Sequence, residues 1–462
     1  VASPSERASL TLATAPLLTL RSILDRLDTY PFGCTEQKIS MAMPYVVLYD
    51  KAYVRNRVLV NARRPVEEQL RLGETRMADA VAAVRASLHY DGVSMWPDGN
   101  ATLFMTAYAA DFLLCLREHG LQCPTDLLEN LLGILEREVM NTPLSVADGR
   151  NKIYATWVLQ RDGRIMTSTL NSLEDWFSKN VNRWESDVLA TLLADSYASL
   201  RMNRRARERL PESVQATGDP LFSAGMARAL HALIMQKAFA AEKRSRVLVD
   251  ALEEAALSPS ATTVDLAMSA RALAEIVANG NEKQMQAVVQ CEEYFPGFAG
   301  TSESLTSQDG LLQFSAPGCR RFGIRAAEPL QDVSALLTGQ GFEKTVSRTA
   351  RSKNMEVEKS LVDDQGAAVK TVGLGDVVTA KICARSHGQA IDDAVIVDLV
   401  PGGLEPVLDR AVRPQEDGLT RFETREDRGI FFVQLLPDTE RCFSYKLRAA
   451  TKGRFVVPGA EV

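Results

Sequence analysis

Apolar residues recur at steps of three and four positions from about residue 15 to residue 290, as in Leu127, Leu131, Leu135 and Val139. This period places apolar side chains on one face of a helix. Pro, Gly and turn-rich connectors such as Tyr90-Asp91-Gly92 separate stretches of roughly 12 to 20 residues. The pattern predicts one long domain of paired helices, and a toroid of helical hairpins is one architecture of this kind.

The period changes to two after Phe295-Pro296-Gly297, where short β-branched runs such as Ala394-Val395-Ile396-Val397-Asp398-Leu399 alternate with turn residues. Enough such runs follow for a β-sandwich. The stretch before them predicts a small connecting β module, and Leu10-Thr11-Leu12 can add a strand to it across the helices. The expected domains are residues 1–14 (strands of the connecting module), 15–295 (helical), 296–350 (connecting β module) and 351–462 (β-sandwich).

The charge and hydropathy of the sequence argue against nucleic-acid binding and against a membrane-spanning segment. The chain has 53 basic and 59 acidic residues, a net charge of −6, and no long basic run, so nucleic acid is not an expected partner. No apolar run reaches the roughly 18–20 residues of a membrane span, and Val1 is followed by polar residues rather than by a signal peptide. Because the chain starts without Met and stops at Val462 without a helical or charged close, we expect it to be a fragment of a longer protein.

The sequence contains seven cysteines. In a secreted protein, an odd number suggests one thiol with a separate role and disulfides for the others. Pairing neighbours along the chain joins Cys115 to Cys123, Cys291 to Cys319, and Cys383 to Cys442. The alternative is that all seven are reduced and buried in a cytosolic protein. Composition does not decide between these two compartments.

The segment Tyr30-Pro31-Phe32-Gly33-Cys34-Thr35-Glu36-Gln37 joins two predicted helices. Pro31 stops the first helix, and Gly33 permits a tight turn into the second, which runs from Cys34 to about Tyr49. Cys34 then lies in the opening turn of a helix, where unpaired N–H groups and the helix dipole favour thiolate over thiol. We therefore expect Cys34 to be a nucleophile.

Gln37 follows Cys34 by three residues and shares its helical face. The Cys34 sulfur can therefore attack the side-chain carbonyl carbon of Gln37, expel ammonia and leave a thioester, helped by the proximity of the two groups. The product is a stored acylating group. A short Cys-x-Glu-Gln string also occurs by chance, so the wider sequence has to decide.

That wider sequence resembles the alpha-2-macroglobulin and complement thioester family in its bacterial form. The eight-residue string around Cys34 is similar to the family's thioester signature. Trp96 and the block Phe104-Met105-Thr106-Ala107-Tyr108 look like its tryptophan and Leu-Thr-Ala-Tyr helix, with Met105 where Leu is usual. The stretch from Asp398 to Glu405, and Arg425-Glu426-Asp427-Arg428 with Phe431-Phe432, are similar to the bacterial terminal macroglobulin-type domain. The matches follow in order along nearly the whole chain.

The resemblance implies an α/α toroid thioester domain, a connecting β module and a C-terminal macroglobulin-type β-sandwich. It implies a broad-spectrum protease inhibitor rather than an enzyme, a single-turnover trap that acylates lysine amines of proteases after a bait segment is cut. That segment precedes the thioester domain in the family, and a Met-Tyr segment that covers the thioester follows the last domain. Bacterial relatives resemble periplasmic guardians of the cell envelope that a lipid anchor, outside this fragment, holds at the membrane. No cofactor and no metal is implied.

A thioester has to be kept from water, and apolar side chains are the physical means. The expected cover consists of Tyr30, Phe32, Trp96 and Tyr108. Ordinary core packing explains each of these aromatic residues equally well. Gly33 and Glu36 are expected to support the turn, Glu36 by accepting a hydrogen bond at the start of the helix.

Two other classes of function stay open. A Cys-dependent amidase would also use an activated cysteine, but it needs a positioned base, and the only histidines are His89, His119, His231 and His387. None of them matches the histidine that transfers the acyl group in complement relatives, so we expect direct attack by amines. In the other alternative, the helices form an adhesion or binding surface and the thioester motif is vestigial.

Overall fold

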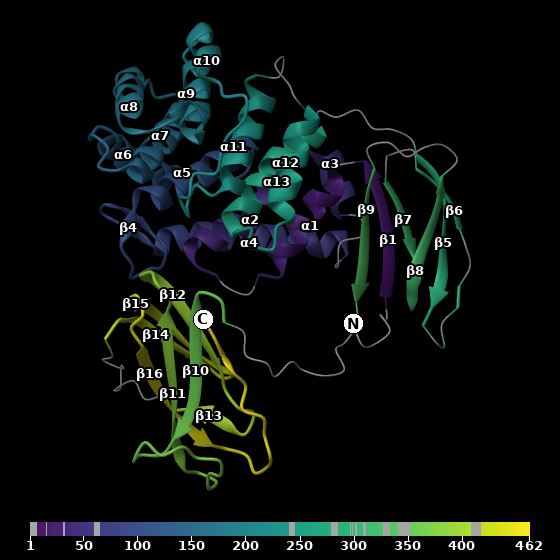
Figure 1. The fold of residues 1–462 in the computed structure, drawn as a ribbon, viewed down its shortest axis with the longest axis vertical. Coiled ribbons are helices and arrows are strands. Elements are labelled where there is room, and N and C mark those ends of the chain that lie inside the picture. The colour runs from purple at the N-terminus through teal and green to yellow at the C-terminus, as the bar shows by residue number, and fades with distance from the viewer. Residues whose placement is uncertain are drawn as a thin grey trace. The chain divides into compact units, whose positions relative to one another are not determined.

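The computed structural model describes residues 7–14, 16–30, 33–59, 65–239, 245–278, 285–295, 297, 299–300, 303–307, 311–326, 333–340, 352–407 and 417–462. The chain separates into two compact units, Val1–Thr345 and Val346–Val462. The first unit combines helices with a β module, and the second is a β-sandwich (Figure 1). The expected fold class, mainly helical with antiparallel sheets, is confirmed.

Thirteen α-helices lie within the described residues. They are α1 (Leu17–Asp28), α2 (Thr35–Val47), α3 (Ala52–Leu59), α4 (Val66–Ala86), α5 (Leu103–Glu118), α6 (Thr125–Val139), α7 (Val146–Arg161), α8 (Thr167–Asn180), α9 (Val188–Ser199), α10 (Asn203–Arg209), α11 (Ala224–Lys237), α12 (Ser245–Leu257) and α13 (Thr263–Ala278). None of these helices is both long enough and apolar enough to span a lipid bilayer.

Six of these helices form a closed ring. Helices α2, α5, α7, α9, α11 and α13 contact one another in succession, and α13 returns to α2. The others pack against members of the ring, as α6 does on α5 and α7, and α12 on α11 and α13 (Figure 1). The ring begins with α2, which follows Cys34, and ends with α13, the last helix among the described residues. Distant parts of the sequence therefore meet where α13 contacts α2.

Burial explains which helices enter the ring. Helix α5 buries 13 of its 16 residues, because apolar or small side chains occupy nearly every position. Helix α6 instead buries a single stripe of leucine, isoleucine and valine side chains. A helix that is apolar all round is stable only when neighbours surround it, whereas an amphipathic helix covers them from outside.

The packing around Gly73 of α4 leaves no room for a side chain. Gly73 lies in the middle of this helix, where glycine costs about 1 kcal/mol relative to alanine. A Cβ here would overlap the Tyr45 ring of α2, and the Tyr45 hydroxyl is held 2.8 Å from each carboxylate oxygen of Asp28. We therefore expect Gly73→Ala to lower the free energy of unfolding by about 1–3 kcal/mol.

Urea unfolding followed by tryptophan fluorescence measures this change. Gly133→Ala is the matched control, since a Cβ at Gly133 in α6 meets only Arg137 Nη1 at 4.0 Å. The control should be neutral or gain up to about 1 kcal/mol from helix propensity. An equal gain in both variants would show that the Tyr45 ring yields easily.

A short hairpin sheet interrupts the helices between α4 and α5. Its strands are β2 (Leu88–His89), β3 (Gly92–Ser94) and β4 (Ala101–Thr102). Gly92 has a φ of 142° at the end of the turn Tyr90-Asp91-Gly92, a backbone conformation that side chains disfavour. The helical period did not predict these strands, which are only two or three residues long.

The β module of the first unit contains two three-stranded antiparallel sheets. One has the order β7 (Leu311–Ser315), β1 (Arg7–Thr14), β9 (Val333–Gln340), and the other has the order β6 (Glu303–Ser307), β5 (Met285–Tyr294), β8 (Cys319–Ala326). In the first sheet, Leu10 lies opposite Phe314 and Leu337. Buried side chains from both sheets, including Leu12, Val289 and Phe314, form one core.

Strand β5 corrects the expected end of the helical domain. The boundary at residue 295 was too late, because Met285–Tyr294 pairs with β6 and β8 in the β module. Within β5, Ala287 and Val289 are buried while Val288 is exposed, which is the alternation of a strand that covers a core with one face. The last described helix before it ends at Ala278.

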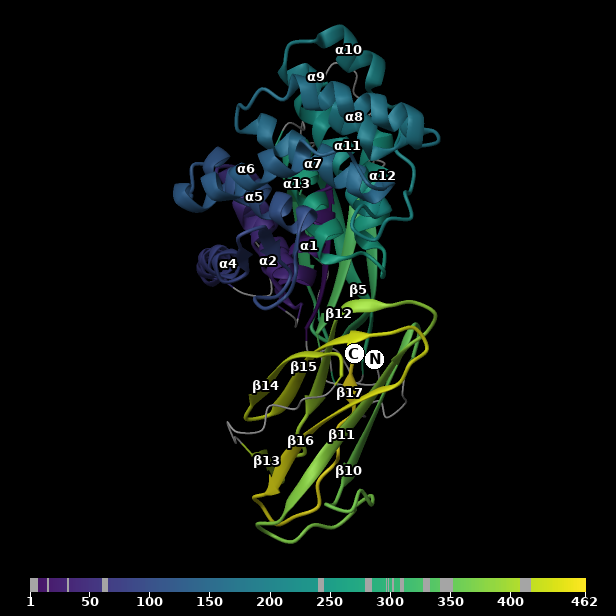
Figure 2. The same ribbon diagram turned by 90° about the vertical axis from the view of Figure 1, so that its left-hand side faces the viewer.

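The second unit is a sandwich of two four-stranded sheets (Figure 2). One has the order β10 (Met355–Val362), β11 (Val377–Ser386), β16 (Arg441–Ala449), β13 (Leu404–Pro406), and the other has the order β14 (Leu419–Arg425), β15 (Arg428–Leu435), β12 (Ile391–Leu399), β17 (Ala460–Glu461). Alternate residues of β11, such as Ala380 and Ile382, are buried. They meet Ile396, Phe431 and Phe443 in the core between the sheets.

Candidate reactive-cysteine site

Cys34 and Gln37 form a reciprocal cap at the start of α2. Cys34 is the N-cap residue, so the helix begins one residue later than expected. The backbone N–H of Cys34 donates to Gln37 Oε1 at 3.0 Å, and the backbone N–H of Gln37 donates to Cys34 Sγ at 3.5 Å. This is a capping box in which a thiol replaces the usual serine or threonine hydroxyl. It holds both side chains on the same side of the turn.

Cys34 is buried while Gln37 is partly exposed, and Tyr30 contacts the Gln37 amide. Cys34 is 2% exposed. Gln37 Nε2 donates to the Tyr30 hydroxyl at 3.4 Å. Burial raises the pKa of the Tyr30 phenol, and the nearby charges of Glu36 and Cys34 raise it further. The phenol therefore stays protonated, and its hydroxyl oxygen accepts the hydrogen bond that positions the Gln37 amide nitrogen.

The hairpin loop that carries Trp96 is anchored to the same turn. The backbone N–H of Thr35 donates to the carbonyl of Met95 at 2.9 Å, and Thr35 Oγ1 lies 2.8 Å from Ser87 Oγ. Ser94 Oγ in turn donates to the carbonyl of Trp96. Trp96 is therefore placed beside the turn through its neighbours and is itself partly exposed.

Glu36 is buried between three helices. Its carboxylate accepts hydrogen bonds from Ser40 Oγ at 2.5 Å and from Thr263 Oγ1, which lies 2.9 Å from each oxygen. Ser40 Oγ also lies 2.8 Å from the hydroxyl of Tyr108. Burial raises the pKa of Glu36, and the bonds from Ser40 and Thr263 act in the opposite direction. The side chain thus joins α2 to α5 and α13, a larger role than the helix-start hydrogen bond that we expected.

The other expected site residues occupy different surroundings. Tyr108 is fully buried, stacks on Phe104 with 5.8 Å between ring centroids, and directs its hydroxyl to Ser40. Gly33 leaves room for Lys38, whose Cε would lie 3.4 Å from an added Cβ. Phe32 lies outside the described residues. The structure therefore brings Tyr30 and the Trp96 loop to the turn and places Tyr108 one hydrogen bond further away, behind Ser40.

Sequence reasoning missed two residues of this site, Ser40 and Thr263. Ser40 lies four positions after Glu36, on the same helical face, so helical spacing could have indicated it. Thr263 begins α13 and is separated from Glu36 by 227 positions. No local pattern indicates such a contact, because it depends on the closure of the helical ring.

The four histidines contact other parts of the first or second unit. His89 Nε2 lies 3.1 Å from Ser94 Oγ, and His119 Nδ1 lies 2.7 Å from Asp50. The remaining two are His231, whose Nδ1 is 3.0 Å from Thr191 Oγ1, and His387, whose Nε2 is 3.8 Å from Glu356. His89 is connected to the Trp96 loop through Ser94.

Two of the three expected cysteine pairs are disulfides in the structure. Cys291 is bonded to Cys319 in the β module, with 5.8 Å between their Cα atoms. Cys383 and Cys442 are directly opposite on β11 and β16, with 4.0 Å between their Cα atoms. That separation is slightly below the expected range of about 4.4–6.8 Å.

The expected pair Cys115–Cys123 is wrong, because both are free thiols. Cys115 is fully buried on α5, where its Sγ lies 3.8 Å from Asp111 and 3.7 Å from Arg161. Cys123 follows the end of α5 and is partly exposed. Burial raises the pKa of the Cys115 thiol to about 11, so it is protonated and unreactive at neutral pH. Spacing along the chain could not reveal that the thiol faces the interior of the ring.

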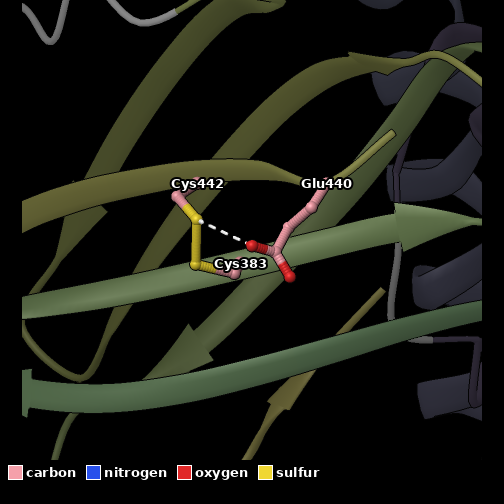
Figure 3. Close-up of side chains that lie close together, drawn as sticks. All are labelled: Cys383, Glu440 and Cys442. Carbon is pink, nitrogen blue, oxygen red and sulfur yellow. Dashed lines mark hydrogen bonds between the residues drawn. A yellow bond between two sulfur atoms is a disulfide. The ribbon is translucent and has the colours of Figure 1, made fainter. Parts of the chain in front are cut away.

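Glu440 lies beside the second disulfide and completes a group of possible metal ligands (Figure 3). One carboxylate oxygen of Glu440 is 3.9 Å from Cys442 Sγ. Both sulfur atoms are already bonded to each other, and metals bind thiolates rather than disulfide sulfur. We therefore assign this group a structural role.

Comparisons with known proteins agree with this geometry. Residues 341–462 match the family model of the bacterial alpha-2-macroglobulin MG10 domain. The chain is 23% identical to the alpha-2-macroglobulin of Rickettsia conorii over 98% of its own length, and 25% identical to the alpha-2-macroglobulin homolog of Yersinia pestis over 97%. It covers 24% of each relative, so it spans about a quarter of their length.

Solved structures of low identity share the fold. The Escherichia coli alpha-2-macroglobulin fragment from domain MG7 to the C-terminus gives a TM-score of 0.76 at 18% identity, over 99% of this chain and 74% of that one. Salmonella alpha-2-macroglobulin reacted with methylamine gives 0.75 at 18% identity, over 98% of this chain and 30% of that one. Sequence relatives, family model and fold agree: the chain is similar to bacterial alpha-2-macroglobulins over nearly its whole length, and its residues 341–462 match their MG10 domain.

Proposed function

We propose that Cys34 and Gln37 form an internal thioester with which the longer protein captures proteases covalently. The observation that carries this proposal is the reciprocal cap, which holds the Cys34 sulfur and the Gln37 carboxamide together in a turn whose cysteine is buried. The relatives named alpha-2-macroglobulin support protease inhibition as the general function. The covalent step is inferred from the chemistry of the turn.

Formation and opening of the bond balance without a cofactor. The Cys34 thiolate attacks the side-chain carbonyl carbon of Gln37, the new C–S bond replaces the C–N bond, and the amide leaves as ammonia with the proton of the thiol. In capture, a lysine amine of the protease attacks the same carbon. A C–N bond forms, the C–S bond breaks, and the electron pair returns to the Cys34 sulfur. Each chain can do this once, so the protein acts as an inhibitor and not as a turnover enzyme.

Several described features would protect the bond until it is needed. Cys34 is almost completely buried, and Tyr30 and the Trp96 loop adjoin the turn. Excluding water slows hydrolysis of a reactive acyl group. We include Tyr30 and Trp96 in this cover, with Phe32 as a further candidate from its position in the sequence. Tyr108 supports the turn from behind through Ser40.

The compartment is part of the proposal. Disulfides persist in oxidising compartments, and both Cys291–Cys319 and Cys383–Cys442 favour the periplasm over the cytosol. Attachment to the cell membrane through a lipid anchor, which the family resemblance implies, belongs to the same proposal.

The mass of the intact protein tests the thioester. We expect the purified chain to be lighter than its sequence by one ammonia, and methylamine to restore that mass deficit, add one methyl group and release one thiol. The variants Cys34→Ala and Gln37→Ala should show neither effect. Cys123→Ala is the matched control, because it removes a partly exposed thiol outside the turn and should keep the deficit.

A wild-type mass equal to that of the sequence, with no response to methylamine in freshly prepared protein, would contradict the proposal. It would favour a binding module with a vestigial motif. Release of ammonia from added amides over many turnovers would instead indicate an amidase.

A further inference from the structure

Glu36 is a buried carboxylate in the first turn of the helix that Cys34 caps. Glu36 is the second residue of α2, two positions from Cys34 and one from Gln37, and it is 8% exposed. Thr263, which donates to both of its oxygens, is the first residue of α13. The carboxylate therefore lies at the start of two helices, whose unpaired N–H groups favour negative charge.

The charge of Glu36 reaches the reactive turn. The phenol of Tyr30, which contacts the Gln37 amide, is influenced by the charges of both Glu36 and Cys34. Charges on these two residues therefore act in one poorly solvated space. In such a space, a carboxylate disfavours a second negative charge nearby, and opening of a thioester places a negative charge on sulfur.

We propose that Glu36 slows the opening of the thioester, an inference that rests on the thioester proposed above. In this proposal, the buried carboxylate opposes the charge that develops on Cys34 sulfur when the C–S bond breaks, and Thr263 keeps the carboxylate ionised and in place. The rate of capture then depends on whether the start of α13 is docked on α2. Because α13 is the last helix before β5, the contact links the reactive turn to the β module.

The groups around Glu36 define what can titrate with it. On or before α2 these are Cys34, Ser40 and Tyr30, on α5 Tyr108, and on α13 Thr263 and Asp265. Burial raises the pKa of Glu36, and the charge of Asp265 contributes in the same direction. Burial also raises the pKa of Tyr108 well above its usual value, so this phenol stays neutral. Protonation of Glu36, which its raised pKa favours, would remove the carboxylate charge from this space.

The thiol of Cys34 is the direct readout. The chain is opened with methylamine in a Cys123→Ser background, and exchange of Cys34 with a pyridyl disulfide is followed from about pH 5 to about pH 9. In this reaction the thiolate attacks one sulfur of the reagent, a mixed disulfide forms, and a pyridine thiol leaves. Glu36→Gln keeps the size and the acceptor oxygen, and we expect it to raise the rate at neutral pH by about three- to tenfold.

Thr263 variants separate charge from packing. Thr263→Val removes the hydroxyl that stabilises the carboxylate, so it should raise the rate only towards acidic pH, where Glu36 then becomes neutral earlier. Thr263→Ser should restore the wild-type profile. Glu174→Gln is the matched control, because Glu174 is another buried carboxylate of the same unit, bound to Tyr197, Arg205 and Arg209. It should leave the profile of Cys34 unchanged.

Identical pH profiles for wild type and Glu36→Gln would overturn the proposal. An equal change in Thr263→Val and Thr263→Ser at all pH values would also overturn it, since that result indicates packing alone. The outcome is separable from the fate of the thioester itself. If the untreated protein shows no ammonia loss, the covalent function fails, yet the thiol profile of Cys34 still measures the effect of Glu36.

Discussion

Replacing Asp111 with asparagine is expected to lower the free energy of unfolding of the helical unit by about 3–5 kcal/mol. Asp111 is completely buried on α5 and contacts two arginines, Arg161 of α7 and Arg271 of α13. Arg271 Nη1 lies 2.9 Å from both carboxylate oxygens, and the Tyr154 hydroxyl donates to Asp111 at 2.7 Å. Asparagine keeps the shape but removes the negative charge that faces the buried Arg271, while Arg161 keeps its second partner, Glu118.

Acid should weaken the same contact. The charges of Arg271 and Arg161 hold the pKa of Asp111 far below its usual range in spite of burial. In the unfolded chain an aspartate has a pKa of about 3.9. The stabilisation from the Asp111 carboxylate is therefore fully present above that pH, and it is lost as the pH falls towards the lower pKa of Asp111 in the folded chain. Wild type should therefore lose stability below about pH 4, and Asp111→Asn should lose less over the same interval.

Tryptophan fluorescence in urea isolates this unit, because all four tryptophans lie between Trp96 and Trp184. Asp126→Asn is the matched control. Asp126 also pairs with an arginine, Arg85, with 2.9 Å between Nη1 and Oδ2, but both side chains are largely exposed. The control should unfold close to wild type. A similar shift in the two variants would mean that the buried cluster contributes no more than a surface pair.

Loss of the disulfide Cys383–Cys442 is expected to destabilise the C-terminal sandwich by about 4 kcal/mol. The bond joins residues 59 positions apart, so it removes much of the chain entropy that the unfolded sandwich would otherwise gain. The double variant Cys383→Ala, Cys442→Ala should unfold at lower urea concentration. Reductant should shift the sandwich of wild type in the same direction and leave the sandwich of the double variant unchanged, since that variant keeps only the disulfide of the first unit.

The sandwich contains no tryptophan, so hydrogen exchange of β11 and β16 amides is the appropriate measurement. The control is Cys291→Ala, Cys319→Ala, which removes the other disulfide, in the first unit. Exchange in β11 and β16 should be the same in that control as in wild type. Unchanged protection after loss of Cys383–Cys442 would show that strand pairing alone determines the stability of the sandwich.

Local patterns along the chain were sufficient for much of the fold. The stripe of Leu127, Leu131, Leu135 and Val139 predicted α6, because a helix with one buried face shows apolar residues at every third or fourth position of its sequence. The two-residue alternation in the last quarter predicted the sandwich for the same reason. Strand β5 was assigned to the helical region, since a ten-residue stretch of mixed apolar and polar residues fits either element until its partners β6 and β8 are known.

The reactive turn was predictable in part. The spacing of Cys34 and Gln37 predicted their proximity, and the structure brings them together in a reciprocal cap. The partners of Glu36 were not predictable, because Thr263 reaches it only when α13 closes the ring on α2. Cys115 was misassigned for a related reason. Its neighbours Asp111 and Arg161 come from two helices, and a spacing rule for cysteines carries no information about them.

The helical ring is, in topological terms, an insertion between strands of one small sheet structure. Strand β1 precedes α1, while β5, β7 and β9 follow α13, and β1 is the central strand of its sheet. Every residue of the ring therefore lies in a loop whose closure depends on eight residues at its start. Loss of β1 from its sheet would leave the hydrogen-bonding edges of β7 and β9 unpaired. The closure of a large ring of helices thus depends on one short strand.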